Sequence, residues 1–127
     1  MAKWVNADVL DFGINNIKTA AIRMLLLNNY TLGDSYATVI AGSNILATVT
    51  MASGDYAIAA SGNNRTLTTL AKSVTASASS STPDLHIGFT NGVDKVLWVT
   101  DETTNQTVTN GNTINFPAIT YQSNQPT

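Results

Sequence analysis

The chain of 127 residues contains no cysteine, which excludes disulfides, thiolate metal ligands and a cysteine nucleophile. This absence fits a protein made in a reducing cytoplasm. Charged residues are also scarce, at 11% of positions, and the six Lys and Arg residues are too dispersed to neutralise a row of phosphates. We therefore expect no nucleic-acid partner. The low charge also leaves little electrostatic repulsion against protein partners or other copies of the chain.

Long apolar runs are missing as well. The run at residues 24–27 is far too short to span a bilayer. Asp8 and Asp11 interrupt the apolar residues near the N-terminus before a signal-peptide core forms. We expect a protein without a membrane partner or an export signal. The length suits one domain, residues 1–127, with a core large enough to need no disulfide or metal.

Motifs that would carry catalysis are few. His86 is the only histidine, so a two-histidine metal site is excluded and a serine triad would depend on that residue alone. We interpret His86 as a residue of a sheet surface or an interface. The carboxylates of Asp94, Asp101 and Glu102 could meet at hairpin ends, but they lack the ligand spacing of a calcium loop. The prediction is a protein that is not an enzyme, with no catalytic residue, no metal site and no cofactor.

Near the N-terminus, residues 8–21 have the periodicity of an amphipathic helix. Its apolar stripe consists of Leu10, Ile14, Ile17 and Ala21. Asn6 or Asp8 would cap this helix, and the Asp8 and Asp11 carboxylates would lie at the positive end of its dipole. We prefer this capping role to a metal or acid–base pair. Residues 1–7 are expected to form an N-terminal arm.

The rest of the chain favours strands. Residues 22–27 are almost continuously apolar and predict a buried central strand, whereas residues 30–42 predict a loop with a short helical turn. Further strands, separated by turn residues, are expected at 45–52, 55–60, 65–70, 73–79, 85–90, 95–100, 106–109 and 113–121. Pro117 cannot donate to a strand ladder, so the last strand should lie at an edge or carry a bulge. The predicted fold class is mainly β: an antiparallel β-sandwich or barrel spanning residues 22–121, with one N-terminal α-helix and a polar tail at 122–127.

The clearest turn signal is Asn91-Gly92, which predicts a hairpin. Strict alternation along the outgoing strand would place Leu97 and Val99 on one face, and Val96 and Trp98 on the other. Both faces of that strand are then apolar. We infer that one face meets another sheet or another subunit.

Aromatic residues are few, so the two tryptophans stand out. Trp98 belongs to the core or to an interface, and Trp4 either anchors on a partner or packs within the chain. The candidate interface residues are Trp4, Val5, Trp98, Tyr121 and Gln122. Among these, Trp98 or Tyr121 would be the stacking platform if the chain were a carbohydrate-binding β module.

Four segments carry a resemblance to a known family: VNADVLDFGINNIKTAAIRMLL, SGDYAIAASGNNRTLTTL, DKVLWVT and TNGNTINFPAITYQ. They resemble small virion proteins of tailed bacteriophages that are encoded among head genes. The resemblance implies a short helix leading into a β domain, and the role of a capsid decoration, or cement, protein. It further implies a chain made in the host cytoplasm that binds the major capsid protein on the virion surface as a homotrimer. A tail, neck or fibre protein is the alternative within the virion.

Overall fold

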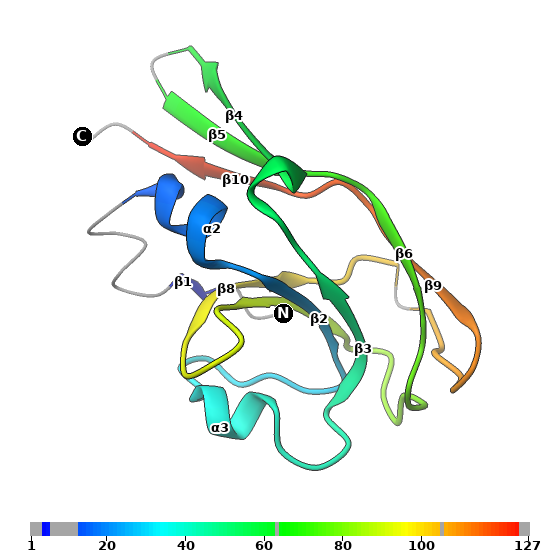
Figure 1. The fold of residues 1–127 in the computed structure, drawn as a ribbon. Coiled ribbons are helices and arrows are strands. Elements are labelled where there is room, and N and C mark those ends of the chain that lie inside the picture. Colours follow the sequence, from blue (N-terminus) through cyan, green and yellow to red (C-terminus); the bar gives the residue numbers. More distant parts are fainter. Residues whose placement is uncertain (1–3, 6–12, 63, 105, 125–127) are drawn as a thin grey trace.

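The computed structural model describes residues 4–5, 13–62, 64–104 and 106–124, and Figure 1 shows their arrangement. The strands are β1 (Trp4–Val5), β2 (Arg23–Leu27), β3 (Ile45–Thr50), β4 (Tyr56–Ser61), β5 (Asn64–Thr69), β6 (Lys72–Thr75), β7 (His86–Thr90), β8 (Val96–Asp101), β9 (Thr113–Phe116) and β10 (Thr120–Ser123). The helices are α2 (Ile14–Ala20), the single turn α3 (Tyr36–Val39) and the 3-10 turn η1 (Ser53–Asp55). Strands therefore dominate the fold.

The largest sheet has five strands in the order β1-β8-β7-β2-β3, and all its pairs are antiparallel. The apolar strand β2 lies between β7 and β3, which confirms the predicted buried central strand. Because side chains alternate along a strand, Met24 and Leu26 enter the larger core cluster while Leu25 and Leu27 enter a smaller cluster on the opposite face.

A second layer contains the three-stranded sheet β10-β5-β4 and the two-stranded pair β6-β9. The larger core fills the space between the layers, with Phe89, Leu67, Ile114 and Phe116 among its buried residues. Figure 1 shows β4, β5 and β10 side by side, and β6 beside β9. The fold is mainly β with antiparallel sheets and one N-terminal helix, as predicted, and it is consistent with a β-sandwich. The described strands do not close into a barrel.

Helix α2 is shorter than the sequence predicted. It begins at Ile14 because Gly13 has a φ of 71°, outside the right-handed helical region. Ile14 and Ile17 are buried as predicted. The expected helical turns at 8–12, with the caps proposed at Asn6 and Asp8, lie outside the described residues. Neither described helix is long and apolar enough to cross a membrane.

The two ends differ from the predicted arm and tail. Trp4 and Val5 form β1, whose backbone pairs with Val99 and Trp98 of β8, so this part of residues 1–7 belongs to the large sheet. At the other end, β10 extends to Ser123, so the strand includes two residues that were expected in the tail. Backbone pairing with a neighbouring strand explains both differences.

Two expected strands are also corrected. Residues 106–109 form no strand, because Val108 exchanges hydrogen bonds with Ser80 and not with a neighbouring ladder. The expected strand 113–121 divides into β9 and β10, which belong to different sheets. Pro117 lies between them, and β10 is an edge strand. The predicted effect of this proline is therefore confirmed, although it interrupts the strand completely.

A bulge in β8 overturns the predicted faces of this strand. Phe89 pairs with Trp98 and Thr90 pairs with Val96, so Leu97 is an extra residue without an opposite partner. Leu97 and Trp98 consequently both enter the larger core, whereas Val96 and Val99 enter the smaller cluster. The predicted pairing of Leu97 with Val99 on one face was wrong because strict alternation fails at a bulge.

Both faces of β8 are covered within the chain. The smaller cluster is closed by Tyr30, Tyr36 and Val39 from the segment between β2 and β3, and by Ile45 at the start of β3. That segment contains α3, with the Ser35 hydroxyl accepting from the Thr38 N–H, which confirms the predicted loop with a short helical turn. The apolar faces of β8 therefore require no second subunit.

Candidate functional site

One cluster of titratable side chains lies inside the fold, at the end of the large sheet. Strand register places His86 of β7 between Leu27 of β2 and Asp101 of β8. His86 is 2% exposed and Asp101 is 8% exposed, and 3.6 Å separates His86 Nε2 from Asp101 Oδ1. This distance allows an ion pair when the imidazole is protonated.

Tyr30 packs against this pair, and Glu102 follows Asp101 along the chain. Tyr30 presents its ring edge-on to His86, with 5.9 Å between the ring centroids, and burial raises the pKa of the Tyr30 phenol. Glu102 is also buried, and its Oε1 accepts from both the N–H and the hydroxyl of Thr104. The prediction of His86 on a sheet surface was wrong, since the loop that carries Tyr30 covers this face of the sheet.

The chemistry of this cluster is limited by its burial. A general base must reach a proton of its substrate. Here the imidazole of His86 and the carboxylate of Asp101 face each other and are both buried, so a substrate cannot reach either group in this conformation. Sequence reasoning missed Asp101 as the partner of His86. Counting opposite residues outward from the hairpin turn could have found this partner. The bulge at Leu97 shifts the count by one residue, so a regular hairpin would not place Asp101 opposite His86.

The three acidic residues weighed as a calcium site are not brought together. Asp94 is exposed in the β7–β8 loop, where its carboxylate accepts from the Asn91 amide. Asp101 and Glu102 lie at the opposite end of β8 and are buried. Within the described ranges, no three His, Asp or Glu side chains are grouped to hold a metal ion.

The candidate interface residues divide between interior and surface. Trp98 is 4% exposed and stacks on Phe89, and Tyr121 contacts the Trp98 ring edge-on at a centroid distance of 5.6 Å. Trp98 therefore lies in the core, the first of its two predicted locations, and its burial leaves no exposed ring face on which a sugar could stack. Burial also raises the pKa of the half-buried Tyr121.

The remaining candidates lie on two separate strands. Trp4 is half-buried against the smaller cluster, on the other side of the large sheet from Tyr121. Val5 contributes the backbone of β1. Gln122 is exposed on β10, where its amide donates to Asn124. The five residues therefore do not form one patch.

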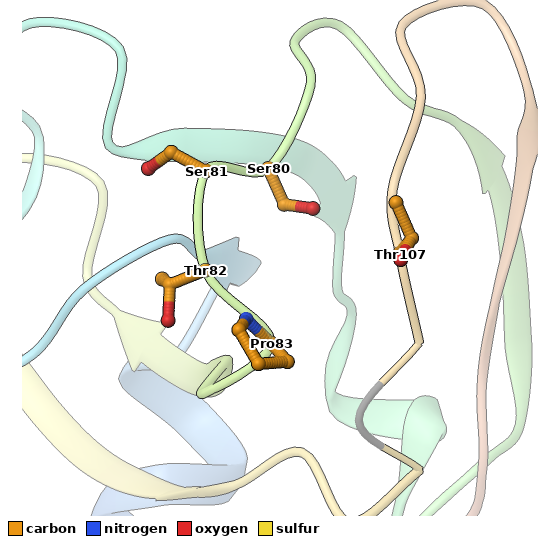
Figure 2. A pocket seen from close by; sticks show the side chains of 5 residues that line it. All are labelled: Ser80, Ser81, Thr82, Pro83 and Thr107. Carbon is orange, nitrogen blue, oxygen red and sulfur yellow. The ribbon is translucent and has the colours of Figure 1, made fainter.

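Two shallow hollows mark the surface. Figure 2 shows the first, of about 260 Å³, where the loop 80–83 faces Thr107. Its lining offers hydroxyl groups and one proline, without a titratable side chain. Such a lining can hydrogen-bond water or a polar ligand, but it offers no acid or base.

The second hollow, of about 240 Å³, lies between β1, the start of α3 and the β7–β8 loop. It combines aromatic and charged side chains: Trp4, Asp34, Tyr36, Asp94 and Lys95 line it. Among the candidates named from the sequence, only Trp4 and Asp94 contribute to this hollow.

The chain has no match among protein-family models, curated proteins or solved structures. The fold and the sites together define a mainly β protein whose described titratable cluster is enclosed.

Proposed function

We propose that this chain is a non-catalytic structural protein of a tailed-bacteriophage virion, and specifically a decoration protein that binds the outside of the major capsid protein shell. The observation that carries the proposal is the chemistry of the exposed strands. β4, β9 and β10 contain no charged residue. Strands at sheet edges normally carry charges that prevent association, so this pattern suits a chain that works in contact with other proteins.

The resemblance of residues 5–26, 53–70, 94–100 and 109–122 to small virion proteins supports the same role. These segments include α2, most of β2, the β4–β5 hairpin, most of β8, and β9 with most of β10. A surface of hydroxyl, amide and methyl groups can be buried against a capsid without removing charges from water, which is the costly step in forming an interface. Binding would stabilise the shell by mass action, because only the intact shell presents the site.

The test is to mix the purified chain with capsids that lack decoration protein and to measure co-sedimentation and capsid heat resistance. We expect saturable binding and a higher temperature of capsid disruption. Trp4→Ala should weaken binding, since Trp4 is the half-buried aromatic residue proposed as an anchor. Val93→Ala is the matched control, because Val93 is an exposed apolar residue in the β7–β8 loop. Absence of co-sedimentation would contradict the proposal.

Location within the virion is tested separately by copy number. Quantitative mass spectrometry should find hundreds of copies per particle for a shell protein, because the shell repeats its subunit many times. Six or twelve copies would instead place the chain in the neck or tail. That result would replace the decoration role with the alternative virion role.

A further inference from the structure

The outer edge of β4 has no strand paired with it in the described part of the chain, although Lys18 of α2 contacts its Tyr56 end. β4 is one of the two outer strands of the sheet β10-β5-β4, and Figure 1 shows it at the margin of the fold with β5 on one side. It pairs with β5 along its whole length without a register shift. It has no proline, no charged residue and no bulge, which are the usual devices that prevent strand addition.

The hydrogen bonds around β4 determine which of its backbone groups point outward. The N–H of Leu70 donates to the Asp55 carbonyl at 2.9 Å, so the backbone carbonyl of Asp55 points toward the β5 side. Backbone direction alternates along an antiparallel strand. The backbone N–H and C=O groups of Tyr56 must then point away from β5. In agreement with this, the Tyr56 carbonyl accepts from Lys18 Nζ of α2 at 2.7 Å.

The same alternation continues along the strand. Ala59 points toward β5, because its carbonyl accepts from the Thr66 hydroxyl. The backbone N–H and C=O groups of Ile58 and Ala60 must therefore point outward. No strand of the described chain pairs with this side of β4.

We propose that this edge binds β4 of a second copy, antiparallel, across a twofold axis that passes beside Ile58. The inference rests on the proposed function, since the crowding of copies on a capsid would supply the local concentration that a short edge contact needs. In this register Ile58 exchanges backbone hydrogen bonds with Ile58 of the second copy, and Tyr56 pairs with Ala60. The Tyr56 carbonyl, which accepts from Lys18 Nζ with one lone pair, accepts from the Ala60 N–H of the second copy with the other. The two three-stranded sheets become one continuous sheet.

The side chains are compatible with this pairing. Ala57 faces Ala59 of the second copy, and both side chains are exposed in one copy and too small to obstruct a strand about 4.8 Å away. The half-buried side chain of Ile58 contacts the Ile58 side chain of the second copy at the twofold axis. No charge lies opposite a like charge within the paired strands, because β4 has none.

Strand direction favours this twofold pair over a ring. β4 and β10 are both antiparallel to β5, so they run in the same direction. A cyclic ring that joined β4 of one copy to β10 of the next would bring them together in parallel. Parallel pairing is slightly less stable per residue than the antiparallel contact of the twofold pair.

The test is amide hydrogen exchange combined with sedimentation across a wide range of protein concentrations. We expect a concentration-dependent dimer in which the Ile58 and Ala60 amides exchange at least tenfold more slowly than in the monomer. Ala57 and Ala59 serve as internal controls, because β5 already protects their amides at every concentration.

Ala60→Pro removes an outward N–H without breaking the β4–β5 ladder, so it should raise the dimer dissociation constant at least tenfold while the chain stays folded. Ala59→Lys should also weaken the dimer, and Thr66→Lys is its matched control because Thr66 lies opposite Ala59 on the inner strand. An unchanged dimer in Ala60→Pro would overturn the inference. So would a monomer at all concentrations, or a trimer in which the Ile58 and Ala60 amides exchange freely.

The outcome is separable from that of the capsid experiment. A dimer that binds no capsid leaves the strand pairing standing and contradicts the decoration role. Capsid binding by a chain that never dimerises contradicts the strand pairing alone. Protection of the Ile58 and Ala60 amides only on the capsid, without a dimer in solution, would assign the β4 edge to the capsid protein instead.

Discussion

The indole ring of Trp98 stacks on the phenyl ring of Phe89, with ring centroids 4.6 Å apart and ring planes inclined by 13°. This contact joins the two strands of the β7–β8 hairpin inside the larger core. It also explains why Trp98 has no exposed face.

Trp98→Ala should therefore destabilise the isolated chain by about 3–5 kcal/mol, the usual cost of removing a buried aromatic side chain. Urea unfolding followed by circular dichroism measures this change. Val93→Ala, at a residue that is 74% exposed, should stay close to wild type. A stable Trp98→Ala monomer would contradict the core assignment.

Asn91 holds the β7–β8 loop through its side chain. Its Oδ1 accepts from the N–H groups of Val93, Asp94 and Lys95 at 3.0, 2.9 and 2.9 Å. Asn91→Ala removes these bonds and should lower the free energy of unfolding by about 1–2 kcal/mol. Thermal unfolding checks the prediction. Asn91→Asp should retain only part of the stability. A carboxylate oxygen can accept the same bonds, but it cannot donate to Asp94 Oδ1, 2.7 Å from the Asn91 amide, and it places two negative charges side by side.

The interaction of Asp55 with Lys72 makes part of the stability depend on pH. The 2.8 Å contact with Lys72, and then the bond from the Ala52 N–H, lower the pKa of the Asp55 carboxyl. A lowered folded pKa means that the stabilisation is complete above the unfolded pKa of about 3.9 and is lost as pH falls through the folded pKa.

Asp55→Asn should consequently be less stable than wild type by about 1 kcal/mol at pH 7. The difference should shrink as pH falls below about 4, where the wild-type carboxyl becomes protonated. Urea unfolding of both proteins from pH 7 to pH 2 measures it. Asp84→Asn, at an exposed carboxylate, is the control. A difference that stays constant down to pH 2 would show that the charge of Asp55 contributes nothing.

The His86–Asp101 contact predicts strong coupling between two buried groups. His86→Leu or Asp101→Asn alone should each cost about 2–4 kcal/mol, because either change leaves the other buried group without its main charged neighbour. The double variant should cost less than the sum of the two by at least about 1 kcal/mol. Additive effects in this double-mutant cycle would show that the two side chains act independently.

Local patterns in the sequence predicted much of the fold. The continuous apolar run predicted β2, because a strand buried on both faces requires it. Asn91 and Gly92 predicted the hairpin, since the Asn91 side chain satisfies the loop and Gly92 adopts a φ of 75°. Pro117 predicted an edge strand or a bulge because it lacks an N–H, and β10 is an edge strand, although the chain leaves β9 before this proline.

Features that depend on register were not predictable in the same way. The bulge at Leu97 decides which core receives Trp98, and no residue type near it marks the position of the extra residue. The same shift aligns Asp101 with His86. Residues 106–109 have strand-like composition, yet no neighbouring strand pairs with them. Val108 forms hydrogen bonds with Ser80 instead.

The sequence by itself determined that the chain consists mainly of strands and turns, and it ruled out thiol chemistry. These properties depend only on residue types and their immediate neighbours in the chain. The tertiary structure alone decided that the loop carrying α3 covers the second face of the large sheet and that His86 meets Asp101 beneath this loop. It also decided that no described strand pairs with the outer edge of β4. Each of these depends on contacts between segments far apart in the chain, and such contacts form only when whole sheets pack against each other.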